Sequence, residues 1–173
     1  VHIDPDCRAA GRRVAGLANC QPGESFLRAL PLRTAAGAMK LSPSLAVGEV
    51  AGWEGVAVEH VSEDGVCKQL LVWWGAAAGA ARQATVVAGD GLDPRATSLQ
   101  AGQAPPASVG DVGRVIIEPD AAVIAAGATD DLAARLAAGG TPAWRLAPGL
   151  DWLTADAPAD TPLARCFGVL ATA

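Results

Sequence analysis

The chain has 173 residues, of which 51% are hydrophobic, and it carries a formal net charge of −5. This length suits one large or two small domains, and the hydrophobic content is ample for a core. The negative charge excludes a chain-wide cationic field of the kind that drives non-specific nucleic-acid binding. The basic residues are uneven, however, and those of the first quarter form either a local positive rim or a solvated surface. They are Arg8, Arg12, Arg13, Arg28, Arg33 and Lys40.

The sequence contains no targeting or membrane signal. No apolar run approaches the ~18 residues of a transmembrane helix, and no signal peptide is visible. We therefore expect no membrane association and a cytoplasmic location. The four cysteines, Cys7, Cys20, Cys67 and Cys166, are far apart and lack zinc-ligand spacing. We expect all four to be reduced structural thiols.

The opening segment, Val1–Asp4, has the composition of a buried strand, in which His2 would be a hydrogen-bonded core or crevice residue. Pro5 imposes an extended conformation on Asp4 and ends the strand. In open α/β sheets the ligand crevice lies at the carboxyl ends of the strands, so the Asp4 carboxylate should point into it. There it could bind a substrate, act as a base or help to hold a metal; capping the next turn is the alternative. An independent domain rarely begins inside a core strand, so we expect the C-terminal part of a longer enzyme.

The next elements form a predicted βαβ unit. Residues 6–21 are polar and rich in glycine and arginine, which indicates a loop. Residues 22–25 look like a helix start, and Pro31 limits the length of that helix. An apolar run over 37–41 is a second buried strand. Strand, helix and strand at this spacing predict that the two strands are parallel neighbours.

The segments 56–61 and 66–74 flank an Asp-Gly pair and predict an antiparallel hairpin. Residues 82–87 should add a third strand to the same meander.

Several side chains of this hairpin invite a functional interpretation. Trp73 and Trp74 must point to opposite faces of their strand, and one of them should belong to the core. His60, Ser62 and Asp64 suggest a triad, but triad members usually converge from separate segments. We therefore expect these polar hairpin residues to face water.

A stretch over 88–113 is rich in glycine, proline and alanine and predicts a domain boundary, with domains at residues 1–104 and 105–173. The second domain should contain a strand over 112–117 and a helix capped by Asp120 that runs to Gly139. Short strands then complete a compact α/β unit, at 144–146, 152–154 and 164–170.

Motifs along nearly the whole chain carry a resemblance. They are Asp4-Pro5-Asp6-Cys7-Arg8, Gly11-Arg12-Arg13-Val14, Met39-Lys40-Leu41-Ser42-Pro43, Glu59-His60-Val61-Ser62-Glu63-Asp64-Gly65, Arg82-Gln83-Ala84-Thr85-Val86 and Ile117-Glu118-Pro119-Asp120. In this order they resemble a bacterial family of class I methyltransferases that use S-adenosylmethionine and carry a THUMP-like C-terminal domain.

The resemblance implies an α/β fold: the C-terminal half of a Rossmann-like methyltransferase sheet, followed by a small THUMP-like domain. Val1–Asp4 would be the fourth strand of that sheet, and the hairpin its final antiparallel pair. Asp4 and Pro5 would face the substrate near the transferable methyl group as catalytic residues. The expected substrate-binding residues are Arg8, Arg12, Arg13 and Lys40. The implied cofactor is S-adenosylmethionine in the intact protein, because the glycine-rich loop that binds it is absent from this chain.

Three functions remain open. The leading one is part of an S-adenosylmethionine-dependent methyltransferase that modifies RNA and is inactive as this chain alone. The second is a non-enzymatic RNA- or protein-binding module. The third is a metal-dependent nucleotide-sugar or phosphoryl enzyme that uses Asp4 and Asp6, although no metal-ligand spacing is evident. The exposed edge of Val1–Asp4 also predicts a homodimer or a covering segment.

Overall fold

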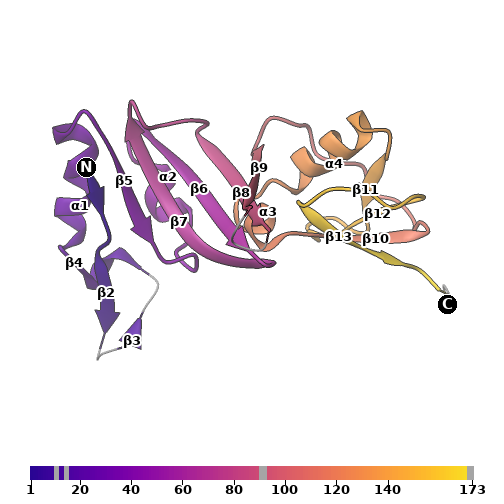
Figure 1. The fold of residues 1–173 in the computed structure, drawn as a ribbon, viewed down its shortest axis with the longest axis horizontal. Coiled ribbons are helices and arrows are strands. Elements are labelled where there is room, and N and C mark those ends of the chain that lie inside the picture. Colours follow the sequence, from indigo (N-terminus) through magenta and orange to yellow (C-terminus); the bar gives the residue numbers. More distant parts are fainter. Residues whose placement is uncertain (10–11, 14–15, 90–92, 171–173) are drawn as a thin grey trace.

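The computed structural model describes residues 1–9, 12–13, 16–89 and 93–170. Two units lie side by side along the longest axis of the molecule (Figure 1). The first is built on a six-stranded sheet and the second on a four-stranded sheet, with a small three-stranded sheet near the N-terminus. No helix among the described residues is long and apolar enough to cross a lipid bilayer.

The six-stranded sheet contains parallel and antiparallel pairs. Its strands, in spatial order, are β1 (His2–Ile3), β5 (Ala36–Leu41), β7 (Val66–Gly75), β6 (Val56–Glu63), β8 (Arg82–Ala88) and β9 (Arg95–Gln100). The helix α1 (Glu24–Arg33) connects β1 to β5, which pair in parallel. The predicted βαβ unit is therefore confirmed. The prediction that His2 lies in the core or a crevice is wrong, because β1 is a two-residue edge strand and His2 is exposed.

The predicted hairpin is confirmed. Strands β6 and β7 pair antiparallel, and Asp64 and Gly65 form the turn between them with φ angles of 53° and 73°. Positive φ at both central residues is the requirement of the tight hairpin turn that Asp-Gly favours. Trp74 is fully buried in the core with Met39 and Leu27, whereas Trp73 is half-buried on the other face.

The third strand of the hairpin region does not extend a meander. A meander would place β8 beside β7, but β5 already occupies that edge of β7 through six residue pairs. The chain instead crosses over, and β8 pairs in parallel with β6. The prediction of a meander is wrong for this reason, although β8 does belong to the same sheet.

The segment predicted as a loop over 6–21 contains extended structure. It forms β2 (Asp6–Ala9), β3 (Arg12–Arg13), the 3₁₀-helix η1 (Leu17–Asn19) and β4 (Cys20–Gln21). Antiparallel pairing of β2 with β4 places Cys7 opposite Cys20, and the two form a disulfide. The prediction of reduced thiols is wrong for this pair, because strand pairing brings together cysteines that are 13 residues apart in sequence. Cys67 and Cys166 are free thiols.

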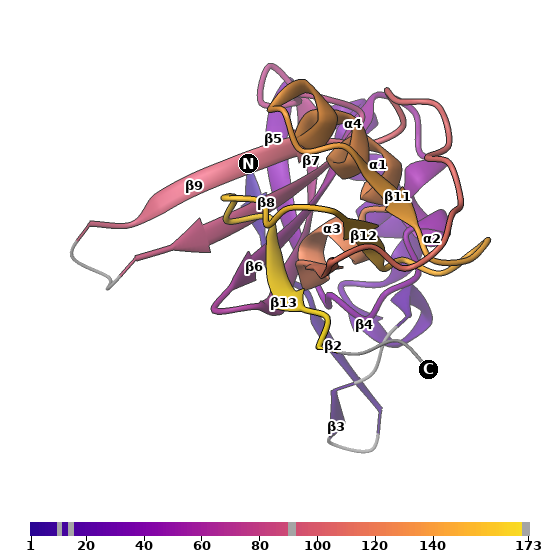
Figure 2. The same cartoon turned by 90° about the vertical axis from the view of Figure 1, so that its right-hand side faces the viewer.

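The second unit combines a four-stranded sheet with two helices. Its elements are β10 (Val115–Pro119), α3 (Ala121–Ala125), α4 (Thr129–Ala138), β11 (Ala143–Arg145), β12 (Leu153–Ala155) and β13 (Ala164–Gly168). The strands are antiparallel in the order β11-β12-β10-β13. Figure 2 looks onto this unit, with the larger sheet behind it.

The single helix predicted after Asp120 is two helices. Asp120 caps α3 as predicted, since its carboxylate accepts a hydrogen bond from the Ala122 amide at 2.8 Å. The helix α3 ends at Ala125, and Gly127, just after the cap residue Ala126, has a φ of 62°; the amides of Gly127 and Ala128 close the last turn. This is a Schellman arrangement, which glycine stabilises because it tolerates the left-handed conformation.

The segment 88–113 also differs from the predicted linker, because it contains β9, which pairs antiparallel with β8. One hydrophobic core joins Val86, which precedes this segment, and Leu99, which lies within it, to Ile117 and Leu132, which follow it. The division at residue 104 stays a prediction.

The short helix α2 (Gly48–Ala51) lies in the first unit, between β5 and β6 in sequence.

The side chains of His60 and Ser62, on β6, lie inside the protein and face the second unit. Their side chains share one face of β6, but they are 1% and 0% exposed, so the expectation that they face water is wrong. Burial has a clear cause: α3 packs across β6, β7 and β8, and Ser62 donates a hydrogen bond to Asp120, the cap of α3. The Nδ1 atom of His60 has no partner among the described residues.

A buried carboxylate on α4 binds the backbone of residues 102–104, which lead from β9 into the second unit. Asp131 is 6% exposed and accepts hydrogen bonds from the backbone amides of Gly102, Gln103 and Ala104 at 2.7–2.8 Å. Three charge-assisted bonds satisfy donors that would otherwise be partly desolvated. Asp131 therefore fixes residues 102–104 against α4.

We predict that Asp131→Ala lowers the free energy of unfolding by about 2–3 kcal/mol, because it leaves several backbone donors without an acceptor. Urea denaturation followed by circular dichroism measures this. Asp156→Ala, at an exposed position, is the control and should change stability little. A loss for Asp131→Ala no larger than that of the control would contradict this role.

We predict a second stability effect that depends on pH. Burial, and secondarily the charge of Arg82, lower the pKa of His60 below its ordinary value of 6.5. As the pH falls, His60 of the unfolded chain therefore binds a proton at a higher pH than His60 of the folded chain does. This contribution to stability is complete above about pH 6.5 and declines as the pH falls below it. The slope from one such group is at most about 1.4 kcal/mol per pH unit.

The variant His60→Leu removes this titration. Urea denaturation at several pH values between 7.5 and 5 should show a shallower loss of stability for His60→Leu than for the wild type, on the order of one proton's slope. Parallel curves for the two proteins would show that His60 does not control this pH dependence.

Candidate functional site

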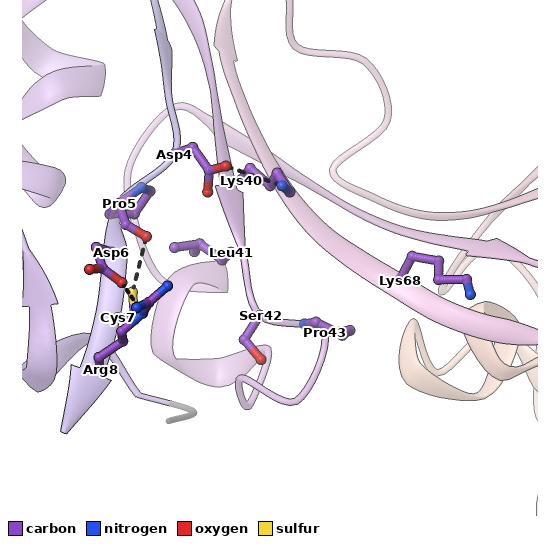
Figure 3. Close-up of a pocket in the computed structure, with 10 residues that line it drawn as sticks. All are labelled: Asp4, Pro5, Asp6, Cys7, Arg8, Lys40, Leu41, Ser42, Pro43 and Lys68. Carbon is purple, nitrogen blue, oxygen red and sulfur yellow. Dashed lines mark hydrogen bonds and ion pairs between the residues drawn. The ribbon is translucent and has the colours of Figure 1, made fainter. Parts of the chain in front are cut away.

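A pocket of about 280 Å³ lies at the carboxyl ends of the parallel strands β1 and β5. Figure 3 shows the side chains around it. They are Asp4, Pro5, Asp6, Cys7, Arg8, Lys40, Leu41, Ser42, Pro43 and Lys68. This is the edge where ligands bind in open α/β sheets.

An ion pair between Asp4 and Lys40 marks one side of the pocket. The register of β1 on β5 places His2 opposite Ala38 and Ile3 opposite Met39. Continuing it by one residue brings Asp4 level with Lys40. The Lys40 Nζ lies 3.1 Å from the Asp4 Oδ2, and the side chains are 39% and 56% exposed. Both side chains are partly exposed and line the pocket, so an incoming ligand can reach the carboxylate.

A second ion pair continues along β2. The Arg8 Nε lies 2.8 Å from the Asp6 Oδ1, with both side chains more than half exposed. Between the two pairs, Pro5 is buried and ends β1. The disulfide at Cys7 links β2 to β4 directly beside this turn. The backbone that carries both carboxylates is thus held by packing, strand pairing and a covalent bond.

Lys68 lines the pocket from a different strand, and the sequence patterns did not identify it as a site residue. Strand β7 runs past the end of β5, where Leu41 pairs with Leu70. Between the pairs Val61–Gln69 and Ser62–Cys67 the register of the hairpin shifts, so Lys68 has no residue opposite it on β6. One sequence signal could have found it: Lys40 and Lys68 are the only lysines in the chain.

The structure brings four of the six predicted site residues to this pocket: Asp4, Pro5, Arg8 and Lys40. Arg12 and Arg13 form β3, but their side chains lie outside the described part of the structure. The catalytic and substrate-binding roles of all six stay predictions.

The carboxylates of the pocket do not form an evident metal site. Asp4 and Asp6 each have a cationic side chain within 3.1 Å. Among the described residues no group of three or more His, Cys, Asp or Glu side chains could hold a metal ion. The donor set of this pocket therefore does not favour the metal-dependent alternative.

Two other polar groups of the larger sheet have structural explanations. Glu59 accepts hydrogen bonds from the indole of Trp73 at 2.8 Å and from the amide of Gln83 at 2.9 Å, so this half-buried carboxylate is satisfied by its neighbours. Burial raises the pKa of the Cys67 thiol, which opposes formation of a reactive thiolate. Neither group extends the pocket.

Comparison with known proteins shows the fold. No protein-family model matches the chain, and no curated protein matches it. The structure is similar to the crystal structure of a proposed methyltransferase from Porphyromonas gingivalis W83, with a TM-score of 0.65 and 21% sequence identity. The match covers 96% of this chain and 42% of that chain, so this chain spans less than half of its neighbour's length. The mixed α/β architecture of this chain is therefore methyltransferase-like.

Proposed function

We propose that this pocket is the acceptor side of a methyl-transfer site in an S-adenosylmethionine-dependent enzyme that modifies RNA. The observation that carries the proposal is the position of Asp4, a carboxylate at the carboxyl end of a parallel strand and open to a pocket. The order β5-β7-β6, with β7 antiparallel to both neighbours, and the methyltransferase-like fold support it.

The chemistry matches what such a carboxylate can do. In methyl transfer an oxygen or nitrogen of the acceptor forms a bond to the methyl carbon, the bond from that carbon to sulfur breaks, and the acceptor loses a proton. Alignment and proton removal are the main requirements. Asp4 would accept the hydrogen bond of the acceptor's O–H or N–H group and then take its proton. Lys40 is a positioning residue that fixes the direction of the carboxylate through the 3.1 Å ion pair.

The described residues fit the acceptor better than the methyl donor. Pro5 follows β1, and Ser42 and Pro43 follow β5, so no glycine-rich turn opens from either parallel strand in these described segments. The proposal requires S-adenosylmethionine as the source of the methyl group. We derive no contact to it and no step through it from these residues.

The finer parts of the proposal concern the partners. Arg8 and Lys40, with Arg12 and Arg13 nearby in the sequence, would contact RNA phosphates. The unit from β10 to β13 would be a THUMP-like domain that helps to bind the RNA. The protein would act in the cytoplasm. The outer edge of β1 is unpaired among the described residues, and a second copy of the chain could pair with it.

We predict that Asp4→Asn lowers kcat for RNA methylation by about 100-fold or more in the full-length protein, because the amide cannot take up a proton. Lys40→Gln should cause a smaller loss, since the carboxylate remains. Transfer of a radiolabelled methyl group from S-adenosylmethionine to total cellular RNA provides the assay.

Asp160→Asn, at an exposed aspartate of the second unit, is the matched control and should retain wild-type kcat. An Asp4→Asn protein that methylates RNA at the wild-type rate would exclude Asp4 as the base.

A further inference from the structure

We propose that Lys68 forms a phosphate-binding site on the side of the pocket opposite Asp4, so that the acceptor is a phosphate-bearing nucleotide or polynucleotide. This inference deepens the proposed function and rests on it, because it assumes that the acceptor enters the same pocket. Figure 3 shows Lys68 on β7, across the view from Asp4 and Arg8.

Among the described residues, Lys68 is the cationic side chain of the pocket that no carboxylate pairs with. The pocket is lined by three cationic side chains, Arg8, Lys40 and Lys68, and by two carboxylates. Both carboxylates are engaged, Asp4 by Lys40 and Asp6 by Arg8. Among the described residues Lys68 has no ion-pair partner, and its side chain is exposed. One uncompensated positive charge therefore lies in the pocket of a protein whose net charge is −5.

The backbone explains how Lys68 reaches this position. The register of the hairpin places Gln69 opposite Val61 and Cys67 opposite Ser62, so Lys68 is the extra residue of a β-bulge. A bulge bends its strand and redirects a side chain, and bulges are frequent beside functional sites. Here the bulge lies where β7 extends past the end of β5, and Lys68 lines the same pocket as Ser42 and Pro43, which follow β5. The regular pairing of β6 and β7 is therefore interrupted at Lys68, the residue of β7 that lines the pocket.

The choice of residue type supports the same assignment. The chain uses arginine for 11 of its 13 basic residues, counted as 13 minus the two lysines, and both lysines line this one pocket. Lysine presents a compact charge on a flexible stem with three donors, which suits a phosphate oxygen approached from several directions.

Binding of phosphate probes tests the site without requiring methyl transfer. The probes are a fluorescein-labelled single-stranded 12-nucleotide oligouridylate, followed by anisotropy, and uridine 5′-monophosphate, followed by calorimetry. We expect Lys68→Gln to weaken oligonucleotide binding by about five- to tenfold and to reduce the dependence of log K on log salt by about 0.7, the value of one released counterion. Lys68→Arg should retain binding within about twofold, since it keeps the charge.

Arg33→Gln is the matched control, because Arg33 is an exposed cation at the end of α1 and does not line the pocket. It should bind as the wild type does. Circular dichroism melting curves should be unchanged in all three variants, since Lys68 and Arg33 are both exposed.

The outcomes separate this inference from the proposed function. Loss of oligonucleotide binding alone in Lys68→Gln supports a backbone phosphate as the ligand, and loss of both probes supports a nucleotide phosphate. Wild-type binding by Lys68→Gln, or no binding of either probe by the wild type, overturns the inference even if methyl transfer occurs. Binding that depends on Lys68, combined with no methyl transfer by the full-length protein, would overturn only the proposed function.

Discussion

Strand β7 pairs with β6 along almost its whole length and with β5 over residues 70–75, both antiparallel. Much of the larger sheet depends on this placement. Because β5 occupies one edge of β7, the next strand must cross to the free edge of β6, where β8 pairs in parallel. Strand β9 then extends the sheet, and the core that it shares with α3 and α4 carries the second unit. Close packing supports the arrangement at Gly37 of β5, where an added Cβ would lie 2.3 Å from the Trp74 ring and 2.5 Å from the Val1 carbonyl.

The same pairing positions the pocket. The β1–β5 register brings Asp4 level with Lys40, and the excess length of β7 carries its bulge past the end of β5. Side chains as far apart in the sequence as Asp4 and Lys68 therefore line one pocket at this edge of the sheet. The buried contacts between the units have another role: Ser62 with Asp120, and Asp131 with the backbone of 102–104, hold the second unit against the sheet. In our proposal, function depends on the pairing of β1, β5 and β7, and stability depends on the contacts between the two units.

Local signals in the sequence predicted elements that depend on neighbouring residues. The Asp64-Gly65 turn and the Asp120 cap each require only a short segment, and the βαβ unit requires only the order of strand, helix and strand; all three are present. Three predictions that depended on which elements pair or pack against each other were wrong. The burial of His60 requires α3, the Cys7–Cys20 disulfide requires β2 and β4 to pair, and the position of β8 requires an edge already occupied by β5. For the pocket, Asp4, Pro5, Arg8 and Lys40 followed from motif resemblance and strand ends, whereas Lys68 required the register of a bulge.

The central claim is that the acceptor enters at the carboxyl edge of β1 and β5. Backbone amide chemical shifts of the isotope-labelled chain, recorded by NMR during titration with single-stranded RNA, test it most directly. We expect the largest shifts in the described residues of β2, at the end of β5 from Lys40 to Ser42, and around Lys68, with small shifts in β11 to β13. Shifts confined to the four-stranded sheet, with none around the pocket, would contradict the account and favour a binding module without a methyl-transfer site.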